Sequence, residues 1–129
     1  MPGSLGNLVL VGAGGFVGSV MRYALSGAVH RFVPMAVFPY GTLAVNGVGC
    51  LLIGVLAGLS DSRNAFGPEM RLFLFLGVLG GFTTFSTFGH ETLALARDGE
   101  RLAASTNVVL QLAVGLGCAW IGYAVASTR

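Results

Sequence analysis

The residues of this chain that could do chemistry are neutral polar side chains set inside apolar stretches. Thr42 and Asn46 lie four positions apart, a spacing that puts two side chains on one face of a helix. Asn107 and Gln111 repeat this spacing near the end of the chain. An amide or hydroxyl group in hydrocarbon is costly unless it finds a partner or faces water. The two rows therefore predict either one water-filled pathway that both rows line or hydrogen bonds that hold helices together.

A second set of polar groups lies in residues 80–88, which have the sequence GGFTTFSTF. Adjacent glycines weaken a helix, and the following Thr83 and Thr84 offer competing side-chain hydrogen bonds. We therefore expect an interruption that frees backbone carbonyls, which an apolar stretch tolerates only where they are buried in protein or line a cavity. Such carbonyls could hold a small cation such as Na⁺. A simple kink without an ion is the alternative.

Beyond this interruption, Phe85 and Phe88 lie three positions apart on one helical face. The edge of an aromatic ring carries positive partial charge, so a Phe side chain can contact an anion with its edge. The same spacing is typical of core packing, and only the neighbouring hydroxyls of Ser86 and Thr87 favour the anion. Glu91 fits either the outer end of a path or a solvated helix terminus.

Arg22 is the charged residue inside the first apolar stretch. Its position predicts a depth of about 10 Å at 1.5 Å per residue, which is too deep for easy contact with water. Two interpretations remain open. The guanidinium either donates structural hydrogen bonds to carbonyls or attracts anions into a vestibule.

Membrane helices must position these residues. Charged residues make up 9% of the chain and hydrophobic residues 54%, whereas soluble domains carry roughly 25% charged residues. A span needs about 20 apolar residues, and suitable stretches occupy residues 5–29, 36–59, 72–96 and 102–128. We predict an all-α membrane protein in a lipid bilayer, with one domain over residues 1–129. It has four transmembrane helices, the third broken mid-membrane, and connectors at residues 30–35, 60–71 and 97–101.

Charge and composition exclude several classes of function. The net charge of +2 comes from scattered Arg residues, which indicates no nucleic-acid partner. Cys50 and Cys118 lie within apolar stretches and are expected as small packing residues. The few titratable residues form neither a nucleophile, base and acid group nor a metal-ligand spacing, so we expect no enzyme.

The arginines give no preferred orientation. With four spans both termini share one side, which collects Arg63, Arg71 and Arg129. The other side collects Arg31, Arg97 and Arg101, or four arginines when Arg22 is counted. An excess of Lys and Arg normally fixes the cytoplasmic side. We therefore expect two oppositely inserted copies in an antiparallel homodimer, which would bring both interruptions together at its centre. In the alternative, a single Arg or another partner sets the orientation.

Small residues four positions apart predict close contact between helices. Three of these pairs consist of two glycines, one in each of the first three stretches: Gly14 with Gly18, Gly54 with Gly58, and Gly77 with Gly81. They indicate packing and do not identify the partner helix.

Three segments resemble, in order and at family spacing, the motifs of the Fluc (CrcB-type) fluoride channels. Residues 14–23 (GGFVGSVMRY) are similar to the family segment GGxxGxxxRY, residues 41–46 (GTLAVN) to GTLxVN, and residues 80–88 to GGxTTFSTF. The resemblance extends along the whole chain.

This resemblance implies a fluoride-selective channel for passive efflux from the bacterial cell, formed by a dual-topology homodimer with two pores in the plasma (inner) membrane. It implies a central Na⁺ held by the backbone carbonyls of Gly80 and Thr83. It also implies a set of pore residues: Asn46, Phe85 and Phe88, joined by position by Thr42, Ser86, Thr87 and Glu91, with Arg22 in the vestibule. The family commonly has Tyr and Ser where this chain places Asn107 and Gln111 along the pore.

Two other functions fit parts of the sequence. A small proton-coupled multidrug exporter also has four helices and dual topology, but it needs a membrane-embedded carboxylate. The first helix here carries Arg22 and no acid. A non-transporting assembly subunit would explain the glycines and the hydrophobicity, but not a hydroxyl-rich interruption.

Overall fold

The computed structural model describes residues 4–34 and 37–128, which contain helices and no β-strand. Within them, four segments are long and apolar enough to cross a membrane: α1 (Leu5–Phe32), α2 (Tyr40–Arg63), the run Pro68–Arg97, and α6 (Arg101–Ser127). The predicted all-α class with four spans is confirmed. Residues 35 and 36, where the first connector was predicted to meet the second span, lie outside the described residues. The same holds for Arg129, which was counted among the arginines that bear on orientation.

The second and third connectors, residues 64–67 and 98–100, are shorter than predicted because the helices around them extend past the apolar stretches. The first connector lies later than predicted, because α1 continues to Phe32 and α2 begins only at Tyr40. α2 continues to Arg63 and ends because Asn64 takes a left-handed conformation (φ 47°), with its N–H donating to the Ser60 carbonyl at 3.1 Å. The next helix begins at Pro68, in the first helical position that suits proline. Residues 60–63 and 68–71, predicted as part of the connector, are compatible with a helix and lie in α2 and α3.

The third span consists of four consecutive elements: α3 (Pro68–Arg71), the π-helical segment η1 (Leu72–Leu79), α4 (Gly80–Phe82) and α5 (Phe85–Arg97). Thr83 and Thr84, between α4 and α5, have extended backbones, with ψ angles of 157° and 118°. Gly80 and Gly81 remain helical. The helix therefore stops at the threonines and not at the glycines.

The threonine side chains contribute to this position. The Thr83 hydroxyl donates to the Leu79 carbonyl at 2.9 Å, in addition to the Thr83 N–H that this carbonyl accepts at 3.0 Å. The Thr84 hydroxyl accepts the backbone N–H of Thr87 at 3.2 Å and so caps the start of α5. The Thr84 hydroxyl therefore replaces the backbone carbonyl to which the Thr87 N–H would donate in an uninterrupted helix.

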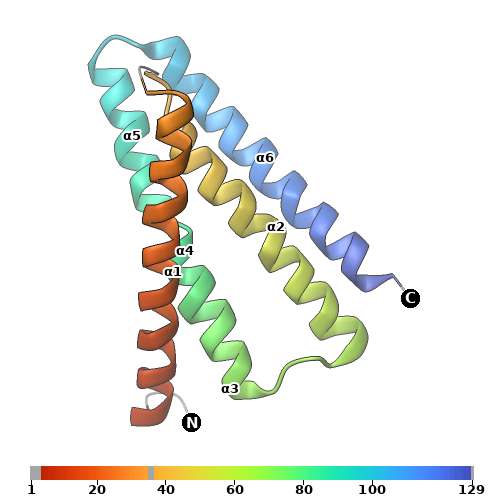
Figure 1. Ribbon diagram of the computed structural model, residues 1–129. Coiled ribbons are helices and arrows are strands. Elements are labelled where there is room, and N and C mark those ends of the chain that lie inside the picture. The colour runs from red at the N-terminus through yellow and green to blue at the C-terminus, as the bar shows by residue number, and fades with distance from the viewer. Residues whose placement is uncertain (1–3, 35–36, 129) are drawn as a thin grey trace.

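Two pairs of helices form the arms of the molecule. In Figure 1, α1 runs beside η1, and α2 lies alongside α6. Glycines allow these helices to approach: a Cβ atom on Gly14 would lie 2.8 Å from the Gly77 Cα, and one on Gly54 would lie 2.9 Å from the Tyr123 nitrogen. All three predicted small-residue pairs lie at such contacts. The buried ring of Phe82 packs against α2 at Gly49, where the two arms meet.

Candidate functional site

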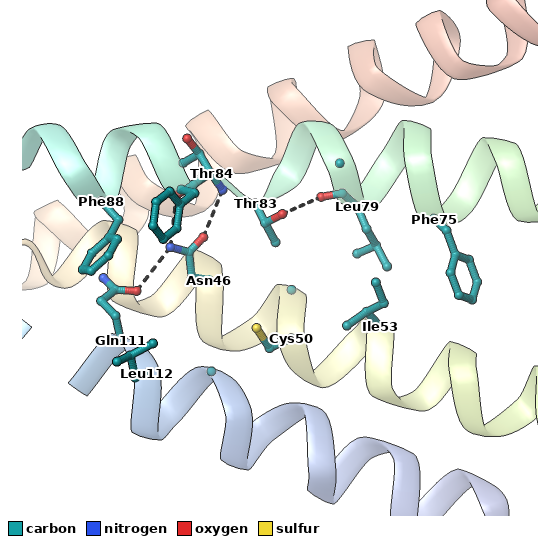
Figure 2. Close-up of a pocket in the computed structure, with 14 residues that line it drawn as sticks. Asn46, Cys50, Ile53, Phe75, Leu79, Thr83, Thr84, Phe88, Gln111 and Leu112 are labelled. Carbon is teal, nitrogen blue, oxygen red and sulfur yellow. Dashed lines mark hydrogen bonds between the residues drawn. The ribbon is translucent and has the colours of Figure 1, made fainter. Parts of the chain in front are cut away.

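Two cavities are lined by Thr84 of the interruption, and the larger of these two, of about 460 Å³, lies where the two arms meet (Figure 2). Its walls come from α2, η1, α4, α5, α6 and the interruption. Six of the residues selected from the sequence line it: Asn46, Gly80, Thr83, Phe85, Phe88 and Gln111. Apolar groups supply most of the remaining wall, including Ile53, Leu79 and Leu112, and none of the lining residues is charged.

Asn46 of α2 joins this cavity to the interruption. Its Oδ1 accepts the Thr84 backbone N–H at 3.2 Å, and its Nδ2 donates to the Thr84 carbonyl at 3.3 Å (Figure 2). The same Nδ2 donates to Gln111 Oε1 at 3.2 Å. The Asn46 side chain therefore pairs with both backbone groups of Thr84 and links the polar rows of α2 and α6.

On α6, Gln111 Nε2 donates to Asn107 Oδ1 at 3.3 Å. Asn107 Nδ2 in turn donates to Thr92 Oγ1 at 2.8 Å, and the Thr92 hydroxyl donates to the Phe88 carbonyl. Asn107 is completely buried and does not line the cavity. Sequence analysis missed Thr92. Its position one turn after Phe88, four residues along α5, was the available signal.

Phe85 and Phe88 form an edge-to-face pair, with ring centroids 5.4 Å apart and an interplanar angle of 61°. Phe85 is 80% exposed in the single chain, whereas Phe88 is half-buried. Both rings belong to the wall of the larger cavity, so the predicted shared face of α5 is confirmed.

A smaller cavity of about 130 Å³ lies on the other side of the interruption. Charged and hydroxyl side chains dominate its wall, which consists of Arg22, Tyr23, Ser26, Thr42, Val45, Thr84, Thr87 and Glu91. Thr84 lines both cavities, although sequence analysis did not select it as a site residue. Thr42 and Asn46, expected on one path, line different cavities.

Two charged residues, Arg22 and Glu91, line the smaller cavity. Arg22 Nε donates to the Gly81 carbonyl at 3.2 Å, which confirms the structural interpretation of this residue and leaves the vestibule role untested. Glu91 Oε1 is buried without a hydrogen-bond partner among the described residues. Ser86 lines neither cavity. It is exposed, and its hydroxyl lies 3.2 Å from Thr84 Oγ1.

Backbone carbonyls are the candidate cation ligands. Within residues 4–34 and 37–128, no group of three or more His, Cys, Asp or Glu side chains could hold a metal ion, and Cys50 and Cys118 are free thiols. The Thr84 N–H, which would bond to the Gly80 carbonyl in a continuous helix, donates to Asn46 instead. Gly80 and Thr83 both line the larger cavity, and carbonyl oxygens suit Na⁺.

Comparison with known proteins identifies the family. Residues 9–123 match the family described as "CrcB-like protein, Camphor Resistance (CrcB)". A protein of Chlorobaculum tepidum is 50% identical over 116 residues, which cover 90% of each chain. A protein of Methylobacillus flagellatus is 47% identical over 116 residues, 90% of this chain and 91% of that one.

A third relative, from Chlorobium phaeobacteroides, is 44% identical over 126 residues, which cover 98% of this chain and 97% of that one. All three relatives carry the name "Fluoride-specific ion channel FluC". Because the family match includes all three motifs and the relatives align along nearly their whole length, this protein belongs to the CrcB family.

Proposed function

We propose that this protein is a fluoride-selective ion channel, and not an enzyme, that lets fluoride leave the cell passively. The observation that carries the proposal is a cavity without charged residues, built around the Asn46 amide and the interruption of the third span. The names of the relatives support fluoride as the ion. Family membership separates the chain from the multidrug exporters and assembly subunits that share its size.

The physics of fluoride fits this cavity. Fluoride is small and strongly hydrated, so its transfer into a region of low dielectric constant is prohibitive unless other donors replace water. Amide N–H groups, hydroxyls and ring edges supply such donors without a fixed charge that would hold the ion. Removing toxic fluoride from the cytoplasm of a bacterium, across its plasma (inner) membrane, is the expected outcome.

We further propose that two inverted copies complete each pore. The Phe85 ring is exposed in a single chain, so a second chain is needed to cover this part of the cavity wall. The similar numbers of arginines on the two sides favour insertion in both orientations. Thr83 and Thr84 lie near the middle of Pro68–Arg97, which supports an interruption at mid-membrane. An antiparallel pair would bring the two interruptions together at its centre.

The Gly80 and Thr83 carbonyls of both copies would hold one structural Na⁺ at this centre. The ion would offset the partial negative charge of the converging carbonyls. In each copy, the proposed path runs from the smaller cavity with Arg22, past Thr84, to the Phe88 side of the larger cavity. Thr42, Thr87 and Glu91 of the smaller cavity would supply its polar track, and Ser86 would join it through the contact of its hydroxyl with Thr84 Oγ1.

Growth under fluoride tests the function. A bacterial strain that lacks fluoride export should grow at an otherwise inhibitory fluoride concentration when it expresses this chain. Expression of Asn46→Asp at the same membrane level should not restore growth. Rescue by both chains, or by neither, would contradict the proposal.

Labelling tests the dual topology. A chain with Cys50→Ser and Cys118→Ser, and with Asn64→Cys in the α2–α3 loop, carries one reactive thiol. A membrane-impermeant maleimide applied to intact cells should label about half of the molecules, because unbiased arginines insert the chain both ways. Labelling of all molecules or of none would show a single orientation.

A further inference from the structure

A continuous chain of hydrogen bonds starts and ends on the third span and crosses two other helices. It runs from the Thr84 N–H through Asn46 of α2 to Gln111 and Asn107 of α6, and returns through Thr92 to the Phe88 carbonyl. Every link lies between 2.8 and 3.3 Å. The chain therefore ties the first two turns of α5 to α2 and α6 beside the larger cavity.

The two ends of this chain fix the orientation of every amide within it. A backbone N–H can only donate, so the Thr84 N–H requires the Asn46 oxygen to face it. A backbone carbonyl can only accept, so the Phe88 carbonyl requires the Thr92 hydroxyl to donate. Each amide between them then turns its oxygen toward the preceding link and its nitrogen toward the following one. Side-chain amides are otherwise difficult to orient.

With these orientations fixed, the amide hydrogens can be counted. A primary amide has two N–H donors. Asn46 uses one on the Thr84 carbonyl and the other on Gln111. Gln111 uses one on Asn107, and among the described residues no second bond occupies its other N–H. Among these three amides, Gln111 therefore combines a free donor with a place on the cavity wall.

The surroundings of Gln111 favour an anion. Figure 2 shows its nitrogen on the side of the Phe88 ring and its oxygen turned toward Asn46. An N–H beside an aromatic edge offers two partial positive charges to the same position in the cavity. Asn107 is completely buried and does not line the cavity; its oxygen accepts the Gln111 nitrogen while its own nitrogen donates to Thr92.

We propose that the free N–H of Gln111 donates to the anion in the larger cavity, and that Asn46 and Asn107 are positioning residues that hold the Gln111 amide in this orientation. This inference rests on the proposed fluoride transport and names a donor for it.

The unmodified protein allows a direct test because Gln111 is the only glutamine in the chain. Protein labelled with ¹⁵N in the glutamine side chain, reconstituted in lipid nanodiscs, gives one NH₂ pair in an NMR spectrum. Fluoride should shift one proton of this pair more than the other, and equal chloride should shift neither. A pair that fluoride leaves unchanged, in protein that releases fluoride from liposomes, would overturn the inference.

Substitutions give the functional readout. Gln111→Met keeps a similar length without a donor and should slow fluoride release roughly 10- to 100-fold, the range expected for a lost hydrogen bond to a charged group. Leu116→Met, at an exposed position of the same helix, should leave release unchanged. Asn107→Leu should slow release and also abolish the fluoride-induced shift of the Gln111 protons.

The outcomes separate the two proposals. Wild-type protein that releases no fluoride would overturn the proposed function and the inference together. Wild-type release that persists unchanged in Gln111→Met would overturn the inference alone. If a variant does not fold, the NMR titration of the wild-type protein still decides the question.

Discussion

The two cavities that share Thr84 differ in the kind of group that could act on an ion. The smaller cavity contains Arg22 and the buried carboxylate of Glu91, whereas the larger one is lined by amides, hydroxyls, aromatic rings and carbonyls without a charged side chain. A charge attracts ions from a distance, but in a region of low dielectric constant it also holds them strongly. Neutral dipoles can replace water without holding the ion. We therefore infer that the smaller cavity attracts the ion and that the larger cavity lets it pass.

The largest expected effect comes from placing a charge in the neutral cavity. Asn46→Asp would put a carboxylate against the Thr84 carbonyl. An unpaired buried charge costs about 3–5 kcal/mol, so fluoride efflux should fall roughly 100-fold or more, as measured with a fluoride electrode on liposomes. Asn64→Asp, in the exposed α2–α3 loop, is the matched control and should behave as wild type. Equal efflux from both variants would remove the distinction between the cavities.

A smaller effect is expected from removing a ring edge. Phe88→Leu keeps an apolar side chain but loses the edge-to-face pair with Phe85. Such an aromatic contribution is worth up to about 1.5 kcal/mol, so fluoride efflux should slow by up to roughly tenfold. Phe16→Leu on the exposed surface of α1 controls for the loss of an aromatic residue. Faster efflux from Phe88→Leu than from this control would show that the ring obstructs the ion.

The positive charge of Arg22 in the smaller cavity should attract fluoride over a distance. Arg22→Gln keeps an amide that can reach the Gly81 carbonyl but removes the positive charge. A unit charge in water is worth about 1 kcal/mol at 4 Å, so efflux should slow about fivefold at low ionic strength. This difference should shrink in high salt, unlike that of Asn46→Asp, because salt screens exposed charges. Arg101→Gln at the exposed start of α6 is the control, and a salt-independent loss in Arg22→Gln would limit Arg22 to its structural bond.

The smallest expected effect concerns one hydroxyl of the smaller cavity. Thr87→Val removes the hydroxyl that accepts from Thr84 Oγ1 at 3.1 Å and preserves the side-chain shape. The loss of one hydrogen bond among several should slow fluoride efflux about twofold to fivefold. Thr106→Val, at an exposed position on α6, gives the reference rate. A loss as large as that of Asn46→Asp would mean that the smaller cavity, too, limits passage.

Helical spacing predicted which polar residues share a face, but not where each one lies in space. Asn107 and Gln111 were placed on one row, and the structure confirms a hydrogen bond between them. Their depths differ, because Asn107 faces Thr92 while Gln111 reaches the cavity wall. Depth depends on which helix packs behind a residue, and spacing within one helix carries no information on that.

The position of the interruption was also only partly predictable from the sequence. The prediction placed an interruption within residues 80–88 and gave equal weight to the glycines and the threonines. Gly80 and Gly81 remain helical, and Gly81 lies in close contact with Gly15 of α1. The extended residues are Thr83 and Thr84, because the Asn46 amide pairs with the Thr84 backbone. This partner lies 38 positions away in the sequence and could not be identified from local propensity.

We propose that neutral groups carry a dehydrated fluoride ion past the interruption, and selectivity between halides is the sharpest test. Liposomes that contain the purified protein and equal concentrations of fluoride and chloride allow this measurement, with one electrode selective for each ion. Fluoride should leave the vesicles down its gradient while chloride stays inside. Chloride release at a rate comparable to that of fluoride would rule out passage through neutral groups selective for fluoride.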